Sequence, residues 1–212
     1  KDGASGRNTK ADLVDLAHVT GDLPALNDTT LIVNDTNGGD VEPGDTLCYD
    51  LDIHNIVGLP DATDVTTIIP ISADTTLDNL GLIADGGTVT YSSTGAAGPF
   101  TYVPLPGLDP AVTHVQITWP TLAGGDSFMP MWCVDLDPLM ENGNIVEVQA
   151  EVSSNETSTD VFLSDDPTTP ANNDSTSVTV VASVDFSTTY KEADVASAAP
   201  GDTILYTVRV AE

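Results

Sequence analysis

The two cysteines are the residues of this chain for which a specific chemical reaction is easiest to predict. Cys48 and Cys133 are its only cysteines. In the segment around each cysteine, apolar residues occupy every second position. On a strand they would share one face, and each thiol would lie on the other. If the two segments are antiparallel neighbours in a sheet, the thiols lie within reach of a disulfide, whose Cα atoms are typically ~5.5 Å apart. The alternative is two unpaired thiols, since a zinc site would need further soft ligands.

Oxygen-rich loops are the candidates for a metal site. Carboxylate and amide oxygens occur at short spacing in residues 35–40 and again in residues 135–144, and calcium binds about six to eight such oxygens. Neither loop matches the EF-hand pattern. The alternative interpretation is that Asp, Asn and Gly only make turns there. Calcium is therefore the one cofactor that the sequence suggests, with these candidate ligands: Asp35, Asn37, Asp40, Asp135, Asp137 and Glu141.

No arrangement of residues is typical of a catalytic site. The three histidines, at positions 18, 54 and 114, are dispersed, and the chain has no nucleophile elbow, phosphate-binding loop or dinucleotide-binding motif. Paired acids such as Asp50 and Asp52 invite comparison with a glycosidase pair. On a strand, however, residues two apart point to the same solvated face, and no aromatic platform for a sugar accompanies them. We expect no catalytic residues and no enzymatic activity.

The chain is strongly acidic, with 33 Asp and Glu residues, five Lys and Arg residues and a net charge of −28. It has almost no cations to neutralise phosphates, so a nucleic-acid partner is excluded and anionic membrane surfaces are disfavoured. No apolar run of about 18 residues could span a membrane. The charge balance is typical of secreted or salt-adapted proteins, and a disulfide would agree with an extracellular or cell-surface location. Four Asn-x-Ser/Thr triplets could carry glycans there: Asn27, Asn34, Asn155 and Asn173.

Short strands are the elements that must position these residues. From residue 30 onwards, runs with period-two alternation are separated by Gly, Pro, Asn and Asp turns, and long helical periods are nearly absent. About nine short strands predict an all-β, two-sheet β-sandwich over residues 30–181, preceded by an N-terminal extension over residues 1–29. The expected strands span residues 30–34, 46–55, 64–71, 88–92, 100–103, 114–119, 127–137, 144–153 and 175–183.

One phrase, Pro-Gly-Asp-Thr-hydrophobic-x-Tyr, occurs twice, at residues 43–49 and 200–206. Each copy is a tight turn that opens an alternating strand. A turn and strand that recur once per domain length are typical of tandem β modules. Residues 182–212 are therefore expected to begin a second repeat or to form a contact between subunits, with strands at 184–188 and 203–210.

Four phrases also occur in an order that resembles a known family. They lie at residues 41–47, 61–66, 121–127 and 170–175, and they begin Val-Glu-Pro-Gly-Asp, Asp-Ala-Thr-Asp, Thr-Leu-Ala-Gly-Gly-Asp and Pro-Ala-Asn-Asn-Asp. Together they resemble the "conserved repeat" domain of bacterial and archaeal surface proteins, catalogued as domain of unknown function eleven. The resemblance implies immunoglobulin-like sandwiches that are secreted, tandem and without known catalysis. Residues 72–113 are longer than that pattern and residues 1–29 have no counterpart in it, so features particular to this chain are expected in these two stretches.

The sequence therefore predicts a structural module of an extracellular filament or surface assembly, built by β-strand interactions. Two strands alone are a marginal unit in water, so the apolar side chains Ile204, Tyr206 and Val208 need a partner. Either the chain is a fragment whose further strands are missing, or another subunit supplies them. We favour the second, a homopolymer in which Val14 and Leu16 of the extension lie on a donated strand.

Two other functions remain open from the sequence. One is a repeat of a long adhesin-like stalk. The other is a carbohydrate- or calcium-binding module that uses residues 72–113. An aromatic cluster would favour the binding module, and Tyr91, Phe100 and Tyr102 are the only aromatic candidates in that stretch.

Overall fold

The computed structural model describes residues 22–157, 160–183 and 189–210. This part of the chain is all-β, and none of it is a helix long and apolar enough to cross a membrane. One antiparallel sheet has the order β1 (Thr30–Asp35), β2 (Thr46–His54), β9 (Met131–Leu136), β4 (Thr75–Ile83), β6 (Leu108–Asp109), with β8 (Ser127–Phe128) also pairing with β2. The other has the order β12 (Phe162–Leu163), β11 (Glu151–Ser153), β3 (Ala62–Pro70), β7 (His114–Leu122), β5 (Thr88–Ser92).

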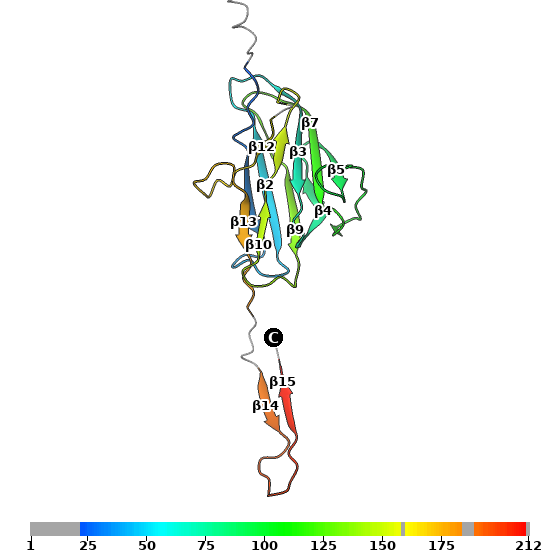
Figure 1. Cartoon of the computed structure of the whole chain (residues 1–212), viewed down its shortest axis with the longest axis vertical. Coiled ribbons are helices and arrows are strands. Elements are labelled where there is room, and N and C mark those ends of the chain that lie inside the picture. Colours follow the sequence, from blue (N-terminus) through cyan, green and yellow to red (C-terminus); the bar gives the residue numbers. More distant parts are fainter. Residues whose placement is uncertain (1–21, 158–159, 184–188, 211–212) are drawn as a thin grey trace, which may run out of the picture.

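Two two-stranded sheets complete the described structure. Strand β10 (Ile145–Val148), which precedes β11 along the chain, pairs with β13 (Thr176–Thr179). Strands β14 (Tyr190–Ala193) and β15 (Tyr206–Arg209) pair only with each other among the described strands. Figure 1 shows the elongated sandwich and the separate β14–β15 hairpin.

The strand order is that of an immunoglobulin-like sandwich, as predicted. The order β1-β2-β9-β4 reproduces the A-B-E-D sheet of that fold, and β3 pairs with β11 as strand C pairs with strand F. Strands β5 and β7 widen the second sheet, and they come from or directly follow residues 72–113, the stretch that is longer than the family pattern.

The core follows the predicted alternation. The odd-numbered positions of β2 and the even-numbered positions of β9 are buried between the sheets, whereas their neighbours are half-buried on the outer face. Tyr49 and Trp132 stack in this core with ring centroids 5.2 Å apart. The hydroxyl of Tyr49 and the indole nitrogen of Trp132 are buried and find no hydrogen-bond partner among the described residues.

The sandwich begins before the predicted boundary at residue 30. Leu26 and Thr29 are completely buried, and the Thr29 hydroxyl donates to the Leu26 carbonyl at 2.7 Å. The Asp165 amide donates to the Thr29 carbonyl at 3.0 Å, which ties this segment to the loop before β13. Only residues 1–21 are therefore left as a candidate donor segment, and they lie outside the described residues.

Two predicted features of residues 72–113 differ from the structure. Strand β4 was not predicted, because its alternation is broken by a bulge between Asp78 and Ile83. The predicted strand over residues 100–103 is wrong, since Tyr102 forms only an isolated bridge to Tyr91. Apart from that bridge, residues 93–107 between β5 and β6 form turns and irregular structure.

The sandwich contains no Lys or Arg side chain. All five Lys and Arg residues lie outside residues 22–183, whereas only eight of the 33 acidic residues do, which leaves 25 carboxylates in that range. The only described Lys and Arg residues, Lys191 and Arg209, are on the β14–β15 hairpin. The hairpin and the sandwich thus differ sharply in charge.

Candidate assembly site

The repeated phrase folds into the same turn in both copies. The Glu42 amide donates to the Asp45 side chain at 2.7 Å, and in the second copy the Ala199 amide donates to the Asp202 side chain at the same distance. The amide of each of these aspartates donates back to the carbonyl three residues earlier, at 3.1 Å in both copies. The glycine before each aspartate, Gly44 or Gly201, has a positive φ that favours glycine. The turn chemistry therefore repeats, and β15 is the counterpart of β2.

The two strands that follow these turns differ in burial. Tyr49 and Leu51 of β2 are each 1% exposed, because the second sheet covers them. Their counterparts in β15, Tyr206 and Val208, are 52% and 59% exposed. Residues two apart on a strand share a face, as do residues directly opposite on paired strands. We call the side of the hairpin with the following residues the hairpin face: Lys191, Ile204, Tyr206, Val208 and Val210.

A lysine on the hairpin face distinguishes it from the core face of the first copy. Lys191 lies opposite Val208, and its ammonium is 3.8 Å from the centroid of the Tyr206 ring. The corresponding position in the first copy is opposite Leu51 and holds Leu31, which is completely buried. Burying a lysine without a partner is costly. The hairpin face is therefore suited to a partner that offers both apolar contact and a carboxylate.

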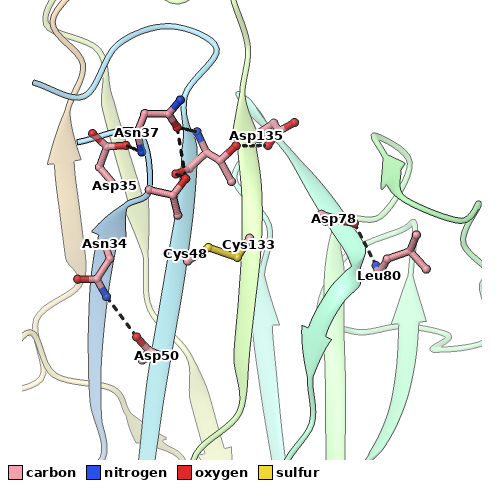
Figure 2. Close-up of a disulfide and its surroundings, with 11 residues drawn as sticks. Asn34, Asp35, Asn37, Cys48, Asp50, Asp78, Leu80, Cys133 and Asp135 are labelled. Carbon is pink, nitrogen blue, oxygen red and sulfur yellow. Dashed lines mark hydrogen bonds between the residues drawn. A yellow bond between two sulfur atoms is a disulfide. The ribbon is translucent and has the colours of Figure 1, made fainter. Parts of the chain in front are cut away.

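The predicted disulfide is present on the outer face of the first sheet. The Leu51 amide donates to the Pro130 carbonyl at 3.1 Å, which fixes the alternation of hydrogen-bonded pairs along β2 and β9. By that alternation Cys48 and Cys133 face each other at a position without hydrogen bonds, where facing Cα atoms come closest. Their Cα atoms are 4.1 Å apart, and the bridge joins the two strands (Figure 2).

Several candidate calcium ligands bond to neighbouring groups of the fold, and two of them, Asn37 and Asp135, bond to the same residue, Thr46. The Asp35 carboxylate accepts the Asn37 amide at 2.9 Å, and the Asn37 side chain accepts the Thr46 amide at 3.0 Å. Asp135 accepts the Thr46 hydroxyl at 2.7 Å. In the described part of the chain no three Asp, Glu, His or Cys side chains are placed to hold a metal. These contacts favour the interpretation that Asp and Asn shape turns here, and calcium binding stays a prediction.

The aromatic residues of the expanded region serve the sandwich. Tyr91 and Tyr102 pack against the core, and the Tyr102 hydroxyl donates to Asp109 at 3.0 Å. This hydrogen bond raises the pKa of Tyr102. Burial alone would raise the pKa of Asp109. Hydrogen bonds donated by the Leu105 and Ala111 amides and by the Tyr102 hydroxyl outweigh the effect of burial and hold that pKa below its ordinary value. Asp109 thus organises its own loop, and Tyr102 takes part in that loop's hydrogen bonds.

The remaining predicted residues fall in two groups. Val14 and Leu16 lie outside the described residues, so the donor strand stays a prediction. The four asparagines of the glycosylation triplets are all exposed. Sequence reasoning missed Lys191 because the connection between the paired positions is three residues shorter in the second copy, so only the strand register aligns Lys191 with Leu31.

Comparisons with known proteins found no matching family model and no matching curated protein. The chain is similar to solved structures at low identity. The RrgA Jo.In complex is 11% identical with a TM-score of 0.46, over 72% of this chain and 79% of that one. An uncharacterized Nocardia farcinica protein with an immunoglobulin-like fold is 13% identical with a TM-score of 0.41, over 73% and 98%. The T6 backbone pilin of serotype M6 Streptococcus pyogenes is 14% identical with a TM-score of 0.39, over 81% and 37%. At these values none of them indicates what this chain does.

Proposed function

We propose that this chain is a structural module of an extracellular surface assembly and that its subunits associate through β-strand interactions. The observation that carries the proposal is the hairpin face. The chain repeats the turn and strand that open its own sandwich, and it leaves exposed the apolar side chains that the first copy buries. Exposed apolar faces of this kind mark contact sites in soluble proteins.

The disulfide and the acidic surface support an extracellular location. A cross-strand disulfide is stable in oxidising compartments. The carboxylates of the sandwich keep isolated modules soluble by mutual repulsion. The exposed glycosylation triplets agree with the same location.

The test compares two substitutions on the same strand. Val208→Asn places an amide on the hairpin face, whereas Thr207→Asn makes the same side chain on the opposite face of β15. We expect the unmodified chain and the Thr207→Asn control to associate with rising concentration in sedimentation velocity, and Val208→Asn to remain monomeric. An unmodified chain that is monomeric throughout, or two variants that behave alike, would refute the assembly role.

The predicted donor strand has a separate test. Deleting residues 1–21 removes Val14 and Leu16 and leaves the buried segment around Leu26 in place. We expect the shortened chain to keep its folded sandwich, as measured by circular dichroism, and to lose its multimers. If the shortened chain assembles at the same concentration as the full chain, the amino-terminal segment is not the donor.

A further inference from the structure

A second exposed apolar surface lies on the outer face of the first sheet, where β4 and β6 meet. Leu108 faces Asp78, and Asp78 faces Cys133, so these side chains share the outer face with the disulfide. Leu80 and Ile83 follow on β4. Leu80, Ile83 and Leu108 are 74%, 52% and 49% exposed. We call these three residues, together with Asp78, the β4 patch.

The β4 bulge holds this patch in place. β9 pairs with Asp78 and again with Ile83, but the residues between them have no ladder partner in the described structure. The Asp78 carboxylate accepts the Leu80 amide at 3.1 Å (Figure 2). The Asn79 side chain donates to the carbonyls of Leu105 and Gly107, the latter at 2.7 Å. Hydrogen bonds thus fix the start of the bulge, and the pairing of Ile83 with Met131 fixes its end, which keeps its apolar side chains on the surface.

The chemistry around the patch selects its partner. Asp78 lies within it, and residues 22–183 contain no Lys or Arg to pair with that carboxylate. A fitting partner must therefore bring apolar side chains together with a cation. Another sandwich surface brings no Lys or Arg, and its carboxylates would repel Asp78.

We infer that the β4 patch binds the hairpin face of a second copy of this chain. In this contact the Lys191 ammonium pairs with the Asp78 carboxylate, while Tyr206 and Val208 cover Leu108 and Ile83. The inference rests on the proposed assembly role and names the surface that receives the hairpin. Because each chain carries both surfaces, the contact is head to tail and extends into a polymer.

The lysine at the position of Leu31 is the reason for choosing this occupant. A hairpin face meant for an ordinary apolar core would not need a cation there, whereas the β4 patch offers a carboxylate beside apolar side chains. A strand from residues 1–21 would add to an edge of the hairpin and would leave this face free. The donor strand and the β4 contact are therefore compatible, and we expect stable assembly to need both, so that loss of either one leaves monomers.

A charge swap tests the pairing in the full chain. Lys191→Glu and Asp78→Lys should each weaken association by about tenfold or more, because each places like charges together in the contact. The double variant, Lys191→Glu with Asp78→Lys, should recover most of the lost affinity. Asp40→Lys is the matched control, since it makes the same charge change at an exposed loop position, and it should not weaken association. Sedimentation velocity at several salt concentrations measures all four variants.

The outcomes separate this inference from the proposed function. If Val208→Asn abolishes assembly but Asp78→Lys and Leu80→Asn leave it unchanged, the hairpin binds elsewhere and only the β4 assignment is wrong. Two damaging single variants without recovery in the double variant would also overturn the pairing. A chain that never associates refutes the assembly role itself. A monomer in which the swap changes amide exchange of the hairpin would place the contact within one copy and overturn the second-copy assignment.

Discussion

Removing the disulfide is the perturbation whose effect follows most directly from the structure. Cys48 and Cys133 already face each other on hydrogen-bonded neighbouring strands, so the bridge adds little to the folded state and acts mainly on the unfolded chain. It closes a loop with a sequence separation of 85 residues. Chain-entropy arithmetic for that length gives about 4.5 kcal/mol at 25 °C, and measured values for single bridges are typically about 2–4 kcal/mol.

We therefore expect the double variant Cys48→Ala with Cys133→Ala to lose about 2–4 kcal/mol of unfolding free energy. For a chain of this size that loss lowers the melting temperature by about 5–15 °C. Urea unfolding followed by circular dichroism measures the free energy. The side chains are half-buried on the outer face, so the alanines should leave no core cavity.

Reductant supplies the matched control for this prediction. It should lower the stability of the unmodified chain to that of the double variant and leave the double variant unchanged. Equal urea midpoints for the oxidised chain and the double variant would refute the entropic reasoning. Two reactive thiols in the unfolded, unreduced chain would show that the bridge is absent.

Three further predictions concern buried and acidic groups. Tyr49→Phe removes a buried hydroxyl without a described partner, so urea unfolding should show equal or up to about 1 kcal/mol greater stability; a clear loss would show that the hydroxyl is hydrogen-bonded. Glu156 accepts the hydroxyl and amide of Thr63 at 2.6 and 2.9 Å, and although burial alone would raise its pKa, these bonds hold it below the ordinary 4.5. The stabilising effect of ionised Glu156 is therefore complete above pH 4.5, and it is lost as pH falls through the pKa of Glu156 in the folded state. Glu156→Gln should therefore reduce the loss of unfolding free energy at acid pH. An unchanged dependence of stability on acid pH would contradict this. If the predicted calcium site exists, millimolar calcium but not magnesium should raise the melting midpoint above its value in chelator. Identical midpoints in a thermal scan would leave only carboxylates that bond within the fold.

Sequence patterns predicted the regular strands because a strand buried on one face has apolar residues at every second position. Leu47 and Tyr49 of β2, and Val146 and Val148 of β10, are all buried as the alternation requires. The same reasoning located the disulfide, since a thiol out of phase with the apolar positions must lie on the outer face. Local alternation was sufficient wherever a strand is straight and pairs along its whole length.

The features that sequence reasoning missed depend on contacts distant in the chain. The β4 bulge interrupts the alternation between Asp78 and Ile83, and only pairing with β9 reveals it. The burial of Leu26 depends on its packing in the core of the sandwich, which no local pattern records. The hairpin lysine is conspicuous only when its position is compared with Leu31. The β4 patch and the hairpin face therefore could not be paired from the sequence alone.

The confinement of all Lys and Arg residues to the ends of the chain also determines how it meets proteases. Trypsin cuts only after these two residue types, and residues 11–190, between Lys10 and Lys191, contain neither. The sandwich therefore has no trypsin site at all, so it survives as one covalent piece even when it is unfolded. The hairpin is the described part that such enzymes can remove, at Lys191 and Arg209. A trypsin-like protease outside the cell would thus cut away the proposed contact element and leave the sandwich intact.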